Sequence, residues 1–383
     1  MLISNWLAMK QKVLPIGLDI GVRRIKMVQL AQADEHLKVV CAERASLDVD
    51  RDASEEERRD AVVQTIKQLL GRRGFRGRKV VSALSRDELR ITSMRLAEAE
   101  THQIEKVLRK EAARRFGLDG ERDTINYMLA GSVRQGDEAK NEFIVLAADD
   151  EVIKSHIALL EDAGLQPAGI DAAPNALFRS FERRLRREED KQRTIILVDV
   201  GHGHTTVVFG RSGGICFVKQ IPSGAARFSE QVASTLGLSV PDAESLRLRL
   251  LRAEPVDACT RRTVVDVVTA AAEALAKELS LCLRYHTVTF RGKRVERAVI
   301  VGGGAYEPIL LDVLRRHLSV EVEVGEPLRG FDRGASASSR GGTGSSADLA
   351  LAVGLSLKGG RQTGGVPGAQ RAEREPVLEG ERL

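Results

Sequence analysis

The sequence predicts an α/β protein made of two similar halves, and two observations carry this prediction. An apolar strand that ends in Asp-x-Gly occurs twice, at Asp19-Ile20-Gly21 and Asp199-Val200-Gly201, and each time a second strand follows after a short turn. Along the rest of the chain, strand patterning alternates with helical periodicity. Such a repeat indicates two similarly built halves that face each other. We place their boundary at about residue 190, in the charged stretch 183–193.

The composition is that of a soluble globular protein. The 383 residues allow about two or three domains, and a net charge of +5 is too small to indicate a nucleic-acid partner. Charged residues interrupt the longest apolar region, 264–283, and residues 1–12 lack a cleavage site, so we expect neither a membrane span nor a secretory signal. Four cysteines without CxxC spacing fit a reducing cytoplasm and exclude a zinc finger or a disulfide framework.

In the first half, the pattern predicts a hairpin followed by alternating strands and helices. The strands at 15–21 and 25–30 form the hairpin, a third strand follows at 37–41, and a charged helix at 55–70. The remaining strands are expected near 80–84, 90–96, 124–130, 142–148 and 166–171, and the remaining helices at 104–116, 152–163 and from about 174.

The second half repeats the hairpin and then becomes more helical. Its strands are expected at 194–201, 205–210, 215–219, 298–301 and 320–324, and its helices at 225–236, 242–251, 263–285, 307–318 and 347–358. The Gly/Ser-rich stretch 333–346 predicts a flexible loop, and the polar residues 359–383 predict a disordered tail.

The two Asp-x-Gly turns predict an anion-binding site. Gly21 and Gly201 allow close approach of the backbone, whose N–H groups at a hairpin tip can form a nest for phosphate oxygens. Two facing carboxylates about 4 Å apart would repel by about 4 kcal/mol. A divalent cation between Asp19, Asp199 and the phosphates removes this repulsion, and Mg²⁺ suits the role because it keeps waters that carboxylates can hold. Lys26, on the returning strand, can reach a phosphate.

A strand that runs into Gly302-Gly303-Gly304 and then a helix leaves room for a base or sugar beside the backbone. The two turns and this triple glycine together predict nucleotide binding. His202 and His204 lack a third ligand and are expected to be turn residues rather than a metal site. The basic clusters at 72–79 and 183–187 are not interleaved with aromatic residues, which indicates solvated faces.

These three motifs resemble the phosphate 1, phosphate 2 and adenosine motifs of the actin/Hsp70/sugar-kinase ATPase superfamily. The segments 159–167, 221–224 and 353–358 resemble, more specifically, the PilM family of type IV pilus assembly proteins, in the FtsA-like branch. The resemblance implies an actin-like (ribonuclease H-like) two-lobed ATPase fold with an FtsA-type inserted subdomain. It divides the chain into a first lobe at 1–190 with the insert at about 86–165, a second lobe at 191–346, a closing helix at 347–358 that returns to the first lobe, and a tail at 359–383.

The resemblance also assigns roles to individual residues. Glu244 and Arg247 match a segment that lines the base and ribose, and Asp171 matches a strand end that supplies a water-activating group in active relatives. Val22 stands where the family has a small hydroxyl residue, which argues against fast hydrolysis, while Thr205 keeps a hydroxyl near the second turn. The expected nucleotide-binding residues are Asp19, Gly21, Val22, Lys26, Asp199, Gly201, Thr205, Glu244, Arg247, Gly302, Gly303 and Gly304, with ATP as ligand and Mg²⁺ held through water by Asp19 and Asp199.

Three functions follow from this resemblance. The first is a cytoplasmic assembly protein at the inner face of the inner membrane, which binds ATP as a structural ligand and docks the N-terminal cytoplasmic tail of a PilN-like membrane protein. It would reach the membrane only through such partners, and self-association stays open. The second is an actin-fold ATPase or small-molecule kinase. The third is an FtsA-like division protein, disfavoured because residues 359–365 have no apolar face, or a type II secretion counterpart.

Overall fold

The architecture is that of a computed structural model of the whole chain. The residues described are 11–33, 36–50, 53–72, 74–97, 103–135, 138–183, 193–211, 214–290, 295–333 and 346–359. The predicted loop at 333–346 and the predicted tail at 359–383 lie almost wholly outside these ranges, as does most of the charged stretch at the predicted boundary.

The first sheet has six strands in the order β14-β3-β2-β1-β4-β8. Its strands are β1 (Lys12–Ile20), β2 (Arg24–Ala33), β3 (His36–Ser46), β4 (Lys79–Ala83), β8 (Gln166–Asp171) and β14 (Asp332–Arg333). The predicted hairpin is confirmed, because β1 pairs with β2 antiparallel, and β1, β4 and β8 run parallel. The short strand β14, which the patterning did not predict, returns from the far part of the chain to the edge of this sheet.

The second sheet repeats this arrangement with five strands in the order β11-β10-β9-β12-β13. Its strands are β9 (Thr194–Val200), β10 (Thr205–Arg211), β11 (Gly214–Ile221), β12 (Val295–Val301) and β13 (Glu321–Val324). The hairpin β9–β10 is antiparallel and β9, β12 and β13 are parallel. The repeat read from the two Asp-x-Gly segments is therefore confirmed at the level of sheet topology.

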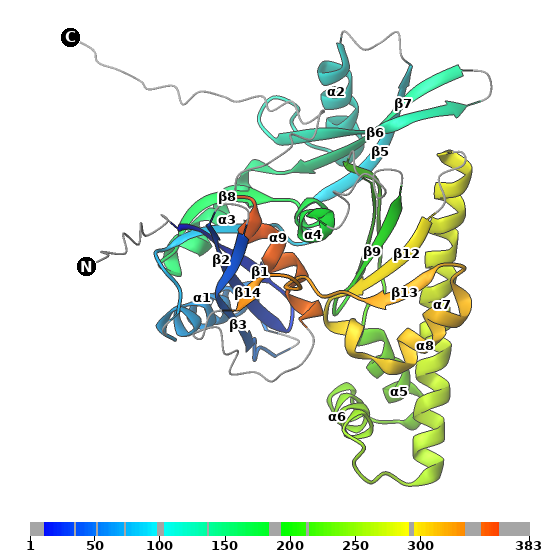
Figure 1. The fold of residues 1–383 in the computed structure, drawn as a ribbon. Coiled ribbons are helices and arrows are strands. Elements are labelled where there is room, and N and C mark those ends of the chain that lie inside the picture. The colour runs from blue at the N-terminus through cyan, green and yellow to red at the C-terminus, as the bar shows by residue number, and fades with distance from the viewer. Residues whose placement is uncertain are drawn as a thin grey trace, which may run out of the picture.

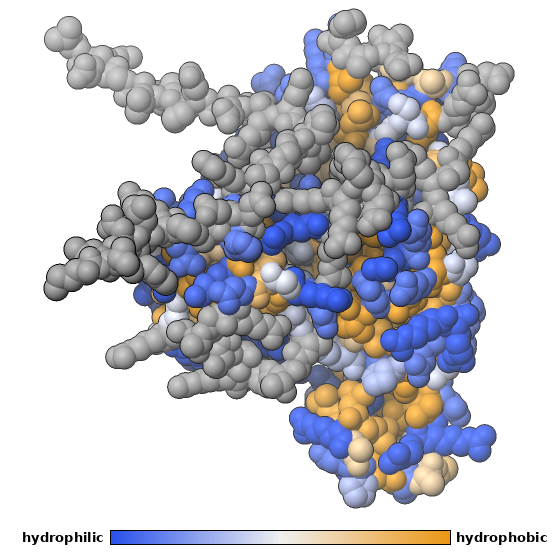
Figure 2. All heavy atoms as spheres, viewed as in Figure 1, coloured by the Kyte–Doolittle hydropathy of each residue, from blue (hydrophilic) through white to orange (hydrophobic). Residues whose placement is uncertain are grey.

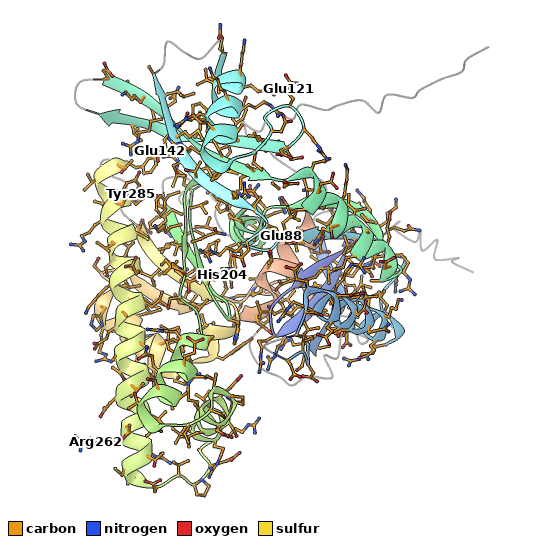
Figure 3. All side chains as sticks on the ribbon, turned by 180° about the vertical axis from the view of Figure 1, so that it is seen from behind. Glu88, Glu121, Glu142, His204, Arg262 and Tyr285 are labelled. Atoms are coloured by element: carbon orange, nitrogen blue, oxygen red, sulfur yellow. The ribbon has the colours of Figure 1, made fainter. Side chains whose placement is uncertain are left out.

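A third sheet lies within the predicted insert. It consists of β5 (Arg90–Ala97), β7 (Glu138–Ala148) and β6 (Thr124–Gln135), in that order. Helix α2 (Ile104–Phe116) packs on one face through Leu108 and Ala112. On the side of the second sheet, Tyr285 donates a hydrogen bond to the buried Glu142 at 3.3 Å. Figure 3 labels both residues, at the end of α7 that meets the small sheet. The small sheet thereby contacts the helix that backs the second sheet.

Helices cover the large sheets in layers (Figure 1). Their bounds are α1 (Glu55–Gly71), α3 (Asp150–Asp162), α4 (Ala173–Glu182), α5 (Ala226–Leu236), α6 (Val240–Leu251), α7 (Ala258–Thr289), α8 (Pro308–His317) and α9 (Ala350–Leu357), with short 3₁₀ segments η4 (Gly303–Tyr306) and η5 (Ala347–Leu349). α1 and α3 pack on the outer face of the first sheet, α4 and α9 lie between the sheets, and α5, α7 and α8 pack on the outer face of the second. Although α3 falls within the predicted insert, it joins the core of the first sheet.

Helix α9 is held tightly against β1 and α4 because glycine stands on both contacting surfaces. A Cβ added to Gly17 would lie 1.9 Å from the Ala352 carbonyl oxygen, and one added to Gly354 would lie 1.7 Å from that of Ala176. Ser356 donates to the Pro15 carbonyl at 2.8 Å. The chain thus returns to the first sheet at its end, with η5 placed where the two large sheets approach each other.

The surface shown in Figure 2 is mixed, and apolar side chains gather at its lower end, over α6 and the start of α7. Leu248, Leu251 and Val265 are among the exposed apolar side chains there. None of the helices in the described part of the chain has the length and apolar character that a bilayer crossing requires.

Candidate functional site

The two Asp-x-Gly turns have the same backbone geometry. In the first, Gly21 N–H donates to the Arg24 carbonyl at 3.0 Å, and in the second, Gly201 N–H donates to the His204 carbonyl at 3.0 Å. A Cβ would come within 2.8 Å of the carbonyl oxygen at Gly21 and 3.0 Å at Gly201. Close approach of the backbone therefore leaves no room for a side chain at Gly21 and little at Gly201.

Asp19 is paired across the first hairpin. The register places it opposite Lys26, whose ammonium donates to Asp19 Oδ2 at 2.8 Å. Only 9% of Asp19 is exposed. Burial opposes the charge of Lys26, but Asp19, Asp199 and Asp348 outweigh that penalty and raise the pKa of Lys26. The lysine is therefore a fixed cation held by the first carboxylate.

Asp199 brings the second hairpin to the same place. Desolvation by burial raises the pKa of this carboxyl to about 6; Lys26 opposes the shift and Asp19 adds to it. A Cβ on Gly302 would lie 2.2 Å from Asp199 Oδ1, so only glycine fits beside this carboxylate. Residues from both halves and from the triple glycine therefore converge, and we call Asp19, Lys26, Asp199 and Gly302 the paired-turn site.

The triple glycine forms a 3₁₀ turn before the predicted helix. Gly302 has φ +82°, and its N–H donates to the Ala347 carbonyl at 3.1 Å. Gly304 packs on Val200, where a Cβ would lie 2.3 Å from the valine Cγ1. Gly303 is the first residue of η4, and α8 then begins at Pro308. These contacts fix the loop against the strand that carries Asp199.

The segment after β11 supports the second turn. Ala225 N–H donates to the Gly201 carbonyl at 2.9 Å, and a Cβ on Gly224 would lie 2.5 Å from the His202 carbonyl oxygen. Thr205 is fully buried, and its hydroxyl donates to the Ser223 carbonyl at 2.7 Å. The structure thus uses the Thr205 hydroxyl to fasten this segment to the turn.

The two residues that the resemblance placed at the base and ribose lie on α6 in different environments. Glu244 is partly exposed and accepts from Arg23 of the first turn at 3.2 Å, which links the two halves. Arg247 is largely buried, donates to Ser229 at 2.7 Å and to Glu307, and lies over the Phe228 ring. Its guanidinium is therefore held in a fixed plane.

Asp171 occupies the same row of the first sheet as Asp19, two strands away. Its carboxylate accepts from Arg179 at 2.9 Å and from the Ala172 N–H at 2.9 Å, and lies 3.4 Å from the Lys358 ammonium. Only 6% of its side chain is exposed. These contacts make it an anchor that ties β8 to α4 and to the end of α9.

Val22, at the first turn, is 50% exposed and contributes no polar group. Among the residues that the sequence did not single out, Asp348 is the best candidate for a functional residue. It is buried, forms an ion pair with Arg44 at 3.2 Å and accepts from Tyr306 at 2.8 Å. Its Oδ2 is buried and has no partner among the described residues. A lone acid at the start of an apolar run is the sequence signal that would have marked it.

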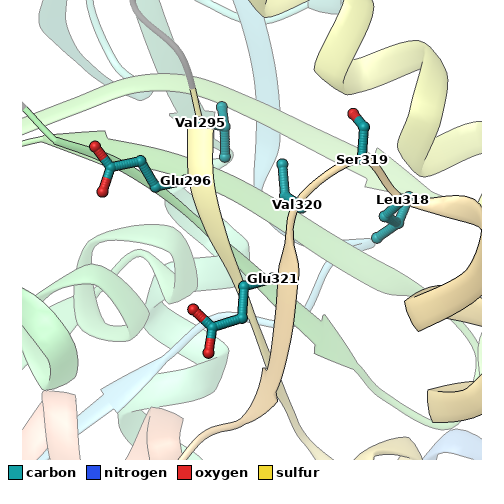
Figure 4. Close-up of a pocket in the computed structure, with 6 residues that line it drawn as sticks. All are labelled: Val295, Glu296, Leu318, Ser319, Val320 and Glu321. Atoms are coloured by element: carbon teal, nitrogen blue, oxygen red, sulfur yellow. The ribbon is translucent and has the colours of Figure 1, made fainter.

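One cavity lies away from the paired-turn site. It has a volume of about 480 Å³ and lies at the amino ends of β12 and β13, where it is lined by residues that include Glu296 and Glu321 (Figure 4). Ligands of open α/β sheets bind at the carboxyl ends of the strands, and Gly302 follows the opposite end of β12. Within the described ranges, no three His, Cys, Asp or Glu side chains converge in metal-ligating geometry.

The duplicated sheets, the helices between them and the paired turns define an actin-like protein. A family model described as type IV pilus assembly protein PilM matches residues 17–360, and the chain belongs to this family. The actin-like fold and the family predicted from the sequence are thereby confirmed.

Solved structures agree with this assignment. A chain of the PilM–PilN type IV pilus biogenesis complex is similar at 22% identity with a TM-score of 0.71, covering 90% of this chain and 98% of that one. The ethanolamine utilization protein EutJ from Carboxydothermus hydrogenoformans is similar at 15% identity with a TM-score of 0.52, covering 90% and 89%. No curated protein sequence matches the chain.

Proposed function

We propose that the paired-turn site binds the magnesium complex of ATP. The observation that carries this proposal is the convergence of Asp19 with Asp199, which lies beside Gly302, from two turns that are closed by the same glycine N–H hydrogen bond. Turns of this kind offer N–H groups to phosphate oxygens. The triple glycine supplies the close backbone approach that an adenosine group needs, and Glu244 stands on the helix expected to face the ribose.

The charges of the site fit a hydrated divalent cation. Two carboxylates and one ammonium leave one negative charge unbalanced at neutral pH, and the raised pKa of Asp199 expresses that imbalance together with its burial. Mg²⁺ prefers oxygen ligands and keeps several of its waters. Asp19 and Asp199 would hold the ion through those waters, and the ion would supply positive charge to the phosphates.

A thermal-shift measurement tests nucleotide binding. Because a ligand that binds only the folded state stabilises it by about 2.7 kcal/mol at one hundred times its dissociation constant, MgATP should raise the melting temperature of the wild-type chain. Asp19→Ala should abolish the rise, whereas Asp312→Ala, at an exposed acid on α8, should keep it. A wild-type chain whose melting temperature MgATP leaves unchanged would refute the proposal.

We further propose that the chain is a cytoplasmic assembly protein at the inner face of the inner membrane. Its membership of the PilM family and its similarity to the PilM–PilN complex support docking of the N-terminal cytoplasmic tail of a PilN-like membrane protein. A synthetic tail peptide should bind the full chain in a calorimetric titration, and a scrambled peptide of equal charge should not. Equal affinity for both peptides would contradict this docking.

In this role ATP is a structural ligand, and hydrolysis is weak or absent. Val22 offers no hydroxyl to the terminal phosphate, and the Asp171 carboxylate is committed to Arg179, Lys358 and the Ala172 N–H. Phosphate release by the wild-type chain should therefore equal that of Asp199→Ala. Steady release well above this control would favour the ATPase or kinase alternative.

A further inference from the structure

We propose that Arg86 binds the terminal phosphate of the nucleotide and so distinguishes ATP from ADP. This inference rests on the proposed function, because it assigns a residue to one end of the same ligand. Arg86 lies in the loop that leaves β4, beside the first turn, and precedes the first strand of the small sheet by four residues.

The duplicated topology places this loop. In the first half Leu18 pairs with Ser82 of β4, and in the second half Val198 pairs with Ile300 of β12. Counting two residues beyond each partner, the segment 84–86 corresponds to the triple glycine 302–304. Adjacent strands lie about 4.8 Å apart, so Arg86 stands beside the turn of Asp19 much as the triple glycine stands beside Asp199.

This correspondence fixes the end of the nucleotide that Arg86 would meet. The two halves face each other, so their equivalent loops flank the paired-turn site from opposite sides. If the triple glycine takes the adenosine group and the two turns take the phosphates, the first-half loop stands beyond the last phosphate. The second half has glycine at this position, which leaves space, whereas the first half has an arginine.

The contacts of Arg86 leave one of its donors unsatisfied, which is expected of a side chain that binds a ligand. Its Nε is buried and has no hydrogen-bond partner among the described residues. Its ion pair with Asp87 is long, at 3.9 Å, and that carboxylate is 93% exposed, so the pair contributes little. An unsatisfied buried donor of a charged group is costly, and a phosphate oxygen would satisfy it. Guanidinium groups suit phosphate oxygens because their planar fork offers several donors.

The site also needs a further cation. A magnesium triphosphate carries net negative charge, yet Lys26 is already held by Asp19 at 2.8 Å. His204, on the second turn, does not supply the charge, since burial lowers its pKa and Arg86 lowers it further, against Asp87 and Asp19. This electrostatic effect also places Arg86 near the second turn. In the view of Figure 3, His204 and Glu88, which follows Arg86 by two residues, both lie in the middle of the molecule.

The test compares ATP with ADP by calorimetric titration in the presence of Mg²⁺. Because a hydrogen bond between charged groups is worth at least about tenfold in affinity, Arg86→Gln should weaken MgATP binding by about that factor and leave MgADP binding unchanged. Arg86→Lys keeps the charge and should recover part of the loss. The control is Arg262→Gln, at an arginine 86% exposed at the far end of α7, which should change neither affinity.

The outcomes separate the two proposals. An Arg86→Gln variant with an unchanged unfolding midpoint that binds ATP as tightly as the wild type, or that loses ATP and ADP equally, overturns the role of Arg86 and leaves nucleotide binding in place. A wild-type chain that binds neither nucleotide overturns the proposed function, and the assignment of Arg86 falls with it.

Discussion

The two hairpins have the same turn and different charge balances. Asp19 and Asp199 each stand one residue before the end of a central strand, and the glycine two residues later makes the same 3.0 Å hydrogen bond in both. The cross-strand partner differs: Asp19 faces Lys26, whereas Asp199 faces Thr206. The first hairpin thus carries its own counter-ion and the second does not.

This difference shows that the two copies of a duplicated motif can have different electrostatic roles. The carboxylate of Asp19 is neutralised by a lysine at 2.8 Å, and the pKa of Asp199, which is desolvated beside Gly302, is raised to about 6. The first half therefore contributes a rigid ion pair and the second half an unbalanced acid that a cation would stabilise. Substitutions that exchange or remove these features test whether the division is real.

The largest effect is expected at the glycine beside the unbalanced acid. Gly302→Ala should destabilise the fold by about 3 kcal/mol or more, because a side chain there meets a φ of +82° and a backbone oxygen 2.6 Å away. Gly203→Ala, in the second turn itself with open space around it, should change stability by less than about 0.5 kcal/mol. Urea unfolding of both variants is the measurement. Equal midpoints for the two would contradict the close approach at Gly302.

Removing the acid of the first hairpin should destabilise the protein. Asp19→Asn takes away the counter-charge that lies directly against the buried Lys26 ammonium, at a cost of about 2–3 kcal/mol. The double variant Asp19→Asn with Lys26→Thr copies the neutral pairing of the second hairpin and should recover part of that loss. Denaturant unfolding of the wild type, both single variants (Asp19→Asn and Lys26→Thr) and the double variant gives the coupling between the two side chains. A single variant as stable as the wild type would show that the pair is not a fixed feature of the fold.

Removing the acid of the second hairpin should have the opposite sign and a comparable size. The pKa of Asp199 is about 6 in the fold and 3.8 as the reference value. Because the fold favours the protonated carboxyl, Asp199 does not destabilise the protein below about pH 3.8. As the pH rises through about 6, the carboxyl ionises in the fold and the free energy of unfolding falls. Asp199→Asn should therefore stabilise the nucleotide-free protein by about 3 kcal/mol at neutral pH.

The pH dependence provides the control for this variant. The difference in unfolding free energy between Asp199→Asn and the wild type should shrink as the pH is lowered from above 6. At low pH the Asp199 carboxyl is protonated, so it is uncharged like the asparagine that replaces it. The same variant should lose the MgATP-induced rise in melting temperature. A difference that stays constant with pH, or that has the sign found for Asp19→Asn, would show that Asp199 is not an unbalanced acid.

Much of this comparison was predictable from local patterns. The two hairpins, the glycines at their turns and the glycine-rich loop after β12 are each marked by a few consecutive residues, and the structure confirms them. Helix α1 was equally clear from the spacing of its apolar residues, and the structure adds a capping box between Ser54 and Glu57 at its start. Local chemistry sets these elements, so the sequence shows them.

What the sequence did not show depends on contacts between distant segments. The resemblance assigned Asp171 to a strand end that supplies a water-activating group, and only the return of α9 to the first sheet brings Lys358 to it. Thr205 looked like a hydroxyl available to a ligand, but its partner is Ser223, which comes 18 residues later. Arg86 had no motif at all, because its position follows from the pairing of β4 with β1. Residue type indicated candidates, and tertiary packing decided their partners.

The smallest effect is expected where the first turn reaches the other half. Arg23 pairs with Glu244 at 3.2 Å, and the corresponding residue of the second turn is Gly203, which has no side chain to make such a link. Both partners are substantially exposed, at 54% and 36%, so Arg23→Ala should cost less than about 1 kcal/mol. A double-mutant cycle with Glu244→Gln measures the pair alone, and added salt should reduce its coupling. A coupling well above about 1 kcal/mol that salt leaves unchanged would contradict the expectation that this exposed pair contributes little to holding the two halves together.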